Sequence, residues 1–405
     1  MTGELSFTET DSAREVSVTS AELRALRRAR HGLVVDEIEE GRARVGPRPG
    51  FAGTVLLPTG RRVVVQPKAP IASIPELLAL AYRTMAPPAS AGSASVEEAT
   101  PTDWLLLQLA GEVRELLARG LRRGYVEQRE LLSYVRGRMR PPVNPSRLPL
   151  TDCEYADFVL DTPENRLLRG VLELVAPAAS HSFVRAELRD VLAVFGEVRL
   201  IRPSVRAFDR VNVTRLNAHY QPSLRLARLA LEGAGVEDAA GAITAPAYFV
   251  PMWQVWEAVV AASLTDAGVR QLHAQPEFAD RFEQIAGGPR VRITLRPDLL
   301  VGPRSSPRLA IELKWGPALV ERYGRKRLRN QHLYQLATYC TALDCDGWLL
   351  YPLIDEGVSS TYRFNDRTIT ITTVDLSVAR LGDLRRVSDE VAAIADGTAP
   401  RVAGP

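Results

Sequence analysis

Cysteine is scarce in this chain of 405 residues, which contains only Cys153, Cys340 and Cys345. Three scattered thiols cannot form a disulfide framework or a four-thiolate zinc site. Long apolar runs are also missing, because proline, glutamine and glutamate interrupt the most apolar stretch, from Ala245 to Leu264. The first residues are polar and acidic, unlike a secretory signal. We therefore expect a cytoplasmic protein that does not enter a membrane.

Lysine is equally rare, since only Lys68, Lys314 and Lys326 occur among 51 basic residues. A lysine that persists where arginine is otherwise used suggests a site that needs a compact ammonium group. Chance is the simpler interpretation for Lys326, which lies inside a basic run. No lysine follows a glycine, which excludes the phosphate-binding loop of P-loop NTPases, so we expect this chain itself to bind no nucleotide.

Charge and length set the general class of the protein. The 51 basic and 48 acidic residues give a net charge of +3, so any surface that binds nucleic acid must be local. An apolar content of 46% over 405 residues is enough for two or three domains with cores of their own, which excludes disorder as the dominant state.

Hydrophobic patterning predicts a multidomain α+β protein. Strand-like alternation between Leu33 and Pro67 follows a short helix opened by a cap at Ser20. Helical periodicity then dominates, and mixed α/β patterning follows it. The expected parts are a disordered tail (1–20), a β-rich N-terminal module (21–95), a helical middle region (96–235), a C-terminal α/β domain (236–385) and a C-terminal tail (386–405).

Two acids and a lysine in the C-terminal domain suggest a catalytic site. Residues 291–297 read as a strand that leads into Asp298, and the next strand carries Glu312 and Lys314 on one face. A short turn joins the two strands, so they should pair and bring Asp298 close to Glu312. Together with the carbonyl of Leu313, the two carboxylates would form a site suited to Mg²⁺, with Mn²⁺ as the alternative ion.

Lys314 would lie at the edge of this site. There its ammonium can orient the attacking water and stabilise charge on a phosphodiester. The alternative is a surface hairpin with a cross-strand salt bridge, which would contribute little to the stability of the fold. The strand is otherwise apolar from Leu309 to Trp315, where two charges are costly without a function. This favours metal-assisted hydrolysis.

Two helices flank these strands. The helix that follows Pro251 places Glu257 on its core-facing side, where a metal or its water is one partner and an arginine is the alternative. Downstream, Gln335 and Tyr339 share a face of the helix from Leu328 to Ala342. Polar groups on that face suit either the site or DNA, and a solvated face is the alternative.

A basic run precedes this second helix. Positive charge beside a metal site is what phosphate contacts would require. The predicted DNA contacts are Arg325, Lys326, Arg327, Arg329 and Tyr339.

These residues resemble the motif of PD-(D/E)xK nucleases. Pro297-Asp298 is followed after thirteen residues by Glu312-x-Lys314 and later by Gln335-x-x-x-Tyr339. From about Arg42 to Leu376 the chain resembles the McrC family, the nuclease subunit of McrBC modification-dependent restriction systems. The wider matches are Val65-Gln66-Pro67-Lys68, Gly120-Leu121 with Tyr125 and Arg136-Gly137-Arg138, Cys153-Glu154-Tyr155, Asp161 to Arg166, Arg215 to Tyr220, and Tyr351-Pro352.

The resemblance implies a PD-(D/E)xK (restriction-endonuclease-like) core with Asp298 and Glu312 as metal ligands, Lys314 as the catalytic lysine, and Glu257 and Gln335 as auxiliary residues. It also implies a Mg²⁺-dependent endonuclease subunit that docks on an McrB-like AAA+ GTPase hexamer through its N-terminal half, so that residues 21–95 form a partner-docking module. The subunit would stimulate the GTPase and cleave methylcytosine-containing double-stranded DNA that the partner recognises. Two alternatives remain: a catalytically silent regulator of the motor, and a stand-alone RecB-like repair nuclease.

Overall fold

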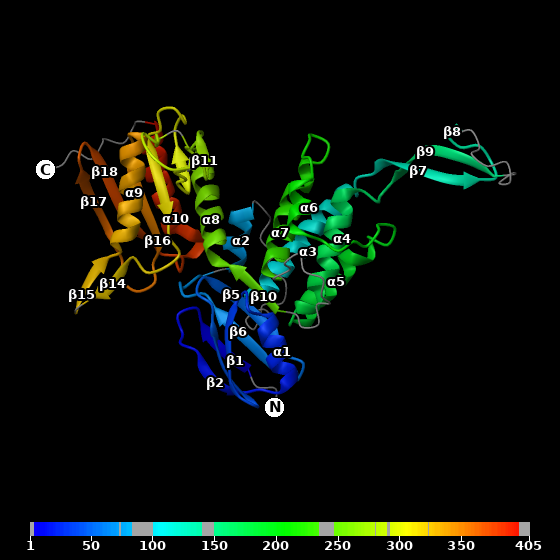
Figure 1. Cartoon of the computed structure of the whole chain (residues 1–405), viewed down its shortest axis with the longest axis horizontal. Helices are drawn as coiled ribbons and strands as arrows, with labels where there is room; N and C mark the ends of the chain where they lie inside the picture. The colour runs from blue at the N-terminus through cyan, green and yellow to red at the C-terminus, as the bar shows by residue number, and fades with distance from the viewer. Residues whose placement is uncertain are drawn as a thin grey trace. The chain divides into compact units, whose positions relative to one another are not determined.

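The computed structural model describes residues 4–72, 74–82, 100–139, 150–234, 247–279, 281–289, 292–322 and 324–396. The chain forms two compact units: residues 1–88 and 249–405 make the first, and residues 89–248 make the second. The β-rich N-terminal module and the C-terminal region therefore share one unit (Figure 1). The expected boundaries near 95 and 235 and the last residues of the C-terminal tail lie outside the described residues.

The N-terminal module contains two sheets. The first has the order β1-β6-β5-β10, with β1 parallel to β6. The second has the order β2-β4-β3, with antiparallel pairs. The strands are β1 (Glu4–Thr8), β2 (Arg14–Ser17), β3 (Leu33–Glu39), β4 (Arg42–Pro47), β5 (Phe51–Leu56), β6 (Arg62–Gln66) and β10 (Ala247–Pro251).

The prediction of a disordered tail over residues 1–20 is wrong for the segment that forms β1 and β2. Phe7 is 1% exposed in the core, and the backbone of β1 is paired along β6. This parallel pairing joins segments far apart in sequence, so local patterning could not reveal it. The following helix α1 (Ser20–Arg28) is capped by Thr19, one residue before the predicted cap, in a capping box with Glu22.

The C-terminal region is built on a mixed six-stranded sheet of order β11-β12-β13-β16-β18-β17. Strands β13, β16 and β18 run parallel, and the other neighbours are antiparallel. Its strands are β11 (Leu272–Ala274), β12 (Leu299–Val301), β13 (Leu309–Leu313), β16 (Asp346–Pro352), β17 (Ser359–Phe364) and β18 (Arg367–Val374). A separate hairpin pairs β14 (Leu319–Arg322) with β15 (Arg325–Leu328).

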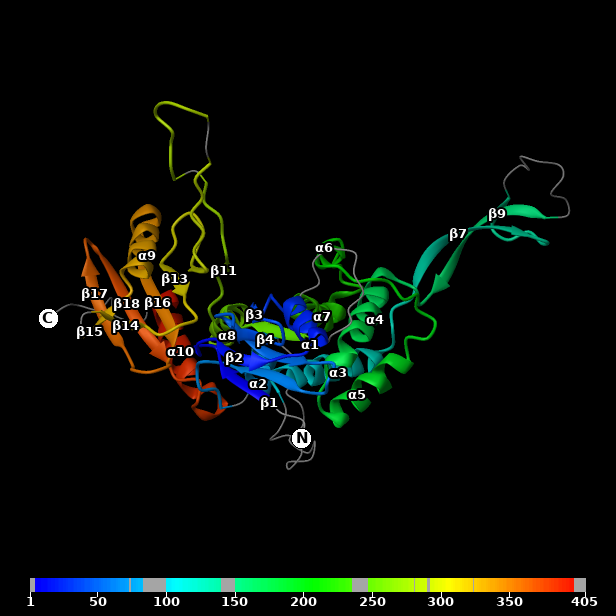
Figure 2. The same cartoon turned by 60° about the horizontal axis from the view of Figure 1, so that its bottom comes forward.

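Helices α8 (Met252–Asp266), α9 (Asn330–Leu343) and α10 (Gly382–Asp396) complete this region. Figures 1 and 2 place α9 along the sheet, and α9 shares a core with Leu300, Ala310 and Leu349. The predicted tail over 386–405 is wrong as far as Asp396, because α10 buries Leu384, Val387 and Val391 at helical spacing.

The second unit combines helices with a three-stranded sheet. Its helices are α3 (Pro101–Arg119), α4 (Pro163–Val175), α5 (Ser182–Ala193), α6 (Val205–Asp209) and α7 (Gln221–Gly233). The sheet has the order β7-β9-β8 and consists of β7 (Gly124–Leu132), β8 (Arg138–Met139) and β9 (Thr151–Val159). The expectation of a purely helical middle region is therefore wrong at this sheet, whose many polar side chains obscure the strand pattern.

A buried network ties the second unit together. The hydroxyl of Tyr220 donates to Asn165 Oδ1 at 2.8 Å and accepts from the backbone N–H of Arg122 at 2.6 Å. Glu164 accepts from Arg122 and from Asn217, both at 2.7 Å. The Asn-Arg and Asn-x-x-Tyr motifs thus hold the start of α4 against the segment that precedes α7.

Two expectations from composition can be compared with the structure. All three cysteines are free thiols, and all three are buried, which their number did not predict. Within the described ranges, every helix is too short or too polar to cross a membrane.

Candidate active site

Asp298 and Glu312 lie on adjacent strands. Leu299 pairs with Ile311 in the antiparallel register of β12 and β13, so the next position places Asp298 opposite Glu312. The backbone N–H of Leu313 donates to Asp298 Oδ2 at 2.7 Å. The predicted pairing of the two runs is confirmed. The predicted strand over 291–297 is wrong, because the described part of it makes only the isolated bridge between Leu295 and Phe278 before Pro297.

Glu312 and Lys314 face α9. Ala310 packs in the core beneath that helix, and side chains alternate along β13, so Glu312 and Lys314 follow on the same side. Lys314 forms an ion pair with Glu312, and its Nζ donates to Gln335 Oε1 at 3.1 Å. Three of the predicted site residues therefore meet between one strand and one helix.

Glu257 reaches this site from α8. Its Oε2 accepts from Gln275 Nε2 at 2.9 Å, and the backbone N–H of Gln275 donates to the Asp298 carbonyl at 2.8 Å. Gln275 has a left-handed φ of 46° and also accepts from Arg296. Gln275 was not predicted from the sequence, because no motif there marks it as a site residue.

All three carboxylates of the site have raised pKa values. Burial, and after it the nearby charge of Asp298, raises the pKa of Glu312 to about 7. Burial also raises the pKa of Asp298, against the N–H of Leu313, which lowers it. The pKa of Glu257 is raised by burial and then by the charge of Asp298. A cluster of acids with raised pKa values is characteristic of a functional site that binds a cation.

The donor set fits a hard divalent cation. Glu312 is 1% exposed, and among the described residues its buried Oε2 has no hydrogen-bond partner. With an oxygen of Asp298 and the Leu313 carbonyl it offers the ligands that Mg²⁺ takes alongside water. Across the described ranges, no three His, Cys, Asp or Glu side chains are grouped to hold a metal by themselves, so water ligands would be needed.

Comparison with known families identifies the family of this chain. The family model described as McrBC 5-methylcytosine restriction system component matches residues 49–352. The chain belongs to this McrBC family.

One solved structure shares the fold of this McrBC-family chain. This chain resembles a chain in the refined half-complex from a tetradecameric assembly of Thermococcus gammatolerans McrB AAA+ hexamers with bound McrC, with a TM-score of 0.54, 14% identity and coverage of 96% of this chain and 100% of that one. A cryo-EM structure of the Thermococcus gammatolerans McrBC complex matches with a TM-score of 0.44 and 16% identity over 66% of this chain and 89% of that one. No curated protein matches it.

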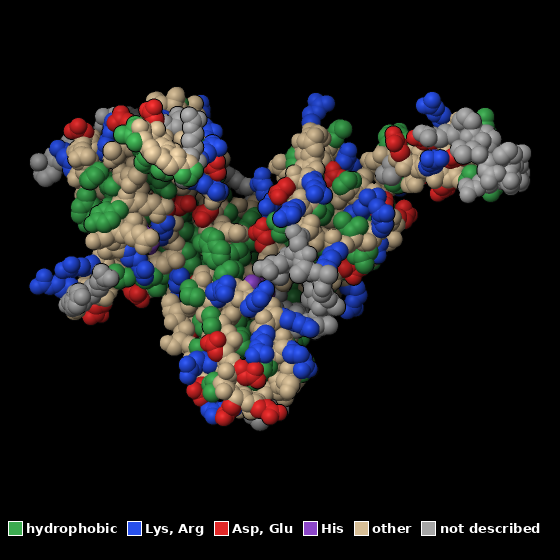
Figure 3. Space-filling view, in the orientation of Figure 1, with side chains coloured by type: hydrophobic (Ala, Val, Ile, Leu, Met, Phe, Trp, Pro, Cys, Tyr) green, Lys and Arg blue, Asp and Glu red, His purple; other side chains and the backbone are tan. Residues whose placement is uncertain are grey.

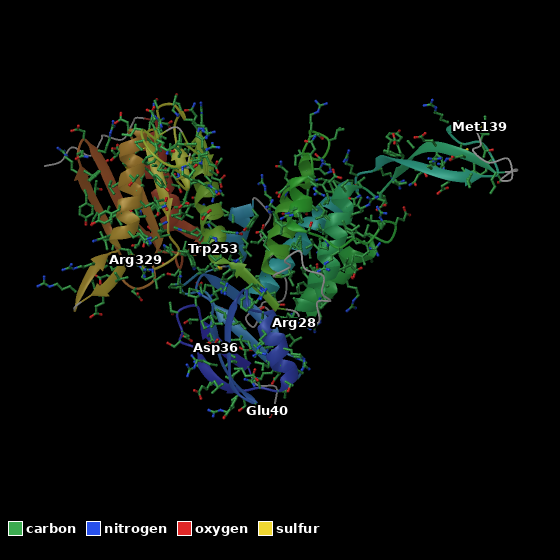
Figure 4. The ribbon with its side chains drawn as sticks, viewed as in Figure 1. Arg28, Asp36, Glu40, Met139, Trp253 and Arg329 are labelled. Atoms are coloured by element: carbon green, nitrogen blue, oxygen red, sulfur yellow. The ribbon has the colours of Figure 1, made fainter. Side chains whose placement is uncertain are left out.

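The basic residues predicted to contact DNA lie on the β14–β15 hairpin and at its junction with α9. Arg325, Lys326 and Arg327 are exposed, and Lys326 forms an ion pair with Glu356. Basic side chains gather on this hairpin in the space-filling view (Figure 3). Figure 4 shows Arg329 where the hairpin meets α9.

Tyr339 has a different environment. It is only 7% exposed, and its hydroxyl donates to the Arg296 carbonyl and accepts from Gln335 Nε2, both at 3.1 Å. The predicted DNA contact is therefore corrected: Tyr339 orients Gln335, since a buried hydroxyl with two partners offers no surface to a phosphate.

The N-terminal module also reaches the site. A pocket of about 360 Å³ is lined by Glu257, Asp298 and Lys314 together with Lys68 from the module. Trp253 forms part of its wall at the start of α8 (Figure 4). The scarcity of lysine singled out Lys68 in the sequence, but nothing there placed it beside the three acids.

Proposed function

We propose that this chain is the metal-dependent endonuclease subunit of an McrBC-like restriction system, with a PD-(D/E)xK core. The observation that supports this most strongly is the meeting of Asp298, Glu312 and Lys314 beside the pocket, where β12 begins and β13 ends. Two properties of Glu312 give the electrostatic reason for a cation there. Its pKa is raised to about 7, and its buried Oε2 has no hydrogen-bond partner among the described residues.

Asp298, Glu312 and the Leu313 carbonyl would hold the cation. A bound Mg²⁺ supplies a Lewis acid and lowers the pKa of a water ligand. The chain itself fixes the ligands, because the N–H of Leu313 donates to Oδ2 of Asp298 and so positions this carboxylate. Burial of Glu312 between strand and helix holds the second carboxylate in place.

Lys314 supplies a positive charge beside the reacting phosphate. Glu312 and Gln335 hold its ammonium, and Tyr339 in turn holds Gln335. An ammonium that is already oriented stabilises the charge that develops on the phosphodiester at little reorganisation cost. Glu257, held by Gln275, is placed to accept a proton or a water hydrogen bond at the edge of the pocket.

The partner follows from the family. The solved assembly that this chain resembles holds McrB AAA+ hexamers with bound McrC, and the described chain lacks a P-loop. We infer that a separate AAA+ NTPase provides the motor and that the 5-methylcytosine of the family name is read by that partner. The substrate is then double-stranded DNA that the motor brings to this site.

Plasmid cleavage with the AAA+ protein from the same genome tests the proposal. Methylated DNA, nucleotide triphosphate and Mg²⁺ should give cleavage by the wild-type chain and none by Asp298→Asn, while both stimulate the motor's NTPase. Asp209→Asn, which changes an exposed acid in the other unit, is the matched control and should cleave normally.

Two outcomes would contradict this function. Stimulation of the NTPase without any metal-dependent cleavage would favour the silent regulator. Equal cleavage by the isolated chain without nucleotide would favour the stand-alone nuclease.

A further inference from the structure

Lys68 is held in the N-terminal module at the mouth of the candidate active site. It follows the end of β6 and lines the same pocket as Asp298 and Lys314. Its side chain is 10% exposed, and its ammonium lies 5.9 Å from the ring centre of Trp315. Trp315 directly follows Lys314 after the end of β13, so the residue beside Lys68 is the chain neighbour of Lys314.

Glu9 organises this corner. Its carboxylate is fully buried and accepts from the backbone N–H of Gly50 at 3.0 Å, from that of Lys68 at 3.2 Å and from Trp315 Nε1 at 3.0 Å. Gly50 has a φ of +88°, and a Cβ there would come within 2.9 Å of Trp253. The close approach of the Gly50 backbone to the Trp253 ring, together with the hydrogen bond from Trp315 to Glu9, fixes the module against the C-terminal region.

The ammonium of Lys68 is not needed to satisfy that carboxylate. Three neutral donors already reach the two oxygens of Glu9, whereas Nζ lies 3.4 Å away, beyond the 2.7–2.9 Å typical of a charge-assisted hydrogen bond. An ammonium carries three donors, so Nζ keeps donors for a ligand in the pocket. Glu9 therefore positions the Lys68 ammonium but leaves donors of that ammonium available for a ligand.

We propose that Lys68 binds a backbone phosphate of the DNA adjacent to the phosphate at which cleavage occurs. The N-terminal module would then supply part of the active site. This rests on the proposed nuclease function and extends it, because a second ammonium opposite Lys314 gives the pocket two positions for backbone phosphates. A point charge on a flexible stem suits a backbone phosphate and carries no sequence preference.

The competing role for Lys68 is that of a buried counter-ion for Glu9. Variants of the two residues separate the roles. Lys68→Met removes the charge, Glu9→Gln removes the ion pair but leaves the charge of Lys68, and the double variant restores neutrality if Lys68→Met alone folds poorly. Arg62→Met, which removes an exposed cation from the same module, is the matched control.

Binding of the full-length chain to a fluorescent 20-base-pair duplex, measured by anisotropy in Ca²⁺ at several salt concentrations, provides the test. Lys68→Met and the double variant should weaken binding about tenfold and reduce the slope of log affinity against log salt by roughly one. Glu9→Gln should lower the melting temperature but keep the wild-type slope, and Arg62→Met should match the wild type in both.

Unchanged affinity and slope in Lys68→Met and the double variant would overturn the role of Lys68, and so would wild-type protein that does not bind the duplex. The plasmid assay then shows whether the nuclease function survives, because it compares wild type with Asp298→Asn without reference to Lys68.

Discussion

The backbone N–H of Leu313 lies 2.7 Å from Asp298 Oδ2, so the strand that carries Glu312 and Lys314 also positions the opposing acid. One β ladder thus sets the spacing of all three groups. The cost is electrostatic, because the buried Asp298 and Glu312 repel each other and both have raised pKa values.

This repulsion predicts that Asp298→Asn stabilises the metal-free protein or leaves its stability unchanged, while cleavage falls at least about 10²-fold. Thermal unfolding in EDTA and plasmid cleavage measure the two effects. Asp103→Asn is the contrasting control, because that acid caps α3 and accepts from the backbone of Ser180 at 2.8 Å, so its loss should lower the melting temperature. A large destabilisation by Asp298→Asn would contradict the repulsion.

Lys314→Arg should cleave poorly even though it keeps the charge. The planar guanidinium is bulkier than the ammonium that fits between Glu312 and Gln335, so we expect a loss of about tenfold or more in the cleavage rate. Single-turnover cleavage with saturating motor protein measures it, and Lys326→Arg on the exposed hairpin is the control. Wild-type cleavage by Lys314→Arg would remove the case for a specific ammonium.

His332 predicts an acid-sensitive contribution to stability. Burial lowers its pKa to about 4 from an ordinary value near 6.5, and its Nδ1 lies 2.9 Å from the hydroxyl of Tyr351. The unfolded chain binds a proton below about pH 6.5 and the folded chain does not, so stability falls as the pH drops from 6.5 towards 4. After allowance for solvent screening, the loss is on the order of 1 kcal/mol.

Chemical denaturation at several pH values measures this effect. His332→Gln should lose less stability than the wild type between pH 6.5 and 4. Parallel pH profiles for the two proteins would contradict the assignment.

Close packing of α9 on β16 predicts that Gly347→Ala is destabilising. A Cβ at Gly347 would lie 2.5 Å from Cys340 Sγ and 3.0 Å from Leu336, so the helix must shift. We expect a loss of about 1–3 kcal/mol in the free energy of unfolding, together with weaker cleavage, because Gln335 lies on the same helix.

Gly111→Ala, in the interior of α3 with open space around it, is the control. It should be neutral or stabilising by up to about 1 kcal/mol. Equal unfolding midpoints for the two alanine variants would contradict the prediction, because they would show that α9 can shift without loss of stability.

Local sequence accounts for much of the candidate site. Asp298 and Glu312 belong to strands joined by one short turn, and Gln335 follows on the next helix, so alternation and helical spacing were enough to bring them together. Tyr339 shared that helical face, yet its burial could not be read from spacing, because burial depends on what packs against the helix.

Tertiary structure alone decided how the N-terminal module completes the pocket. Glu9 and Trp315 are 306 residues apart, and β1 pairs in parallel with β6 across a long connection. Neither contact can be predicted from periodicity in the sequence, because each depends on surfaces that exist only after both regions have folded. The two acids, Lys314 and their strands could be predicted from the sequence, because they depend on residues close together in the chain. The position of Lys68 beside them could not, because it depends on packing between the N-terminal module and the C-terminal region.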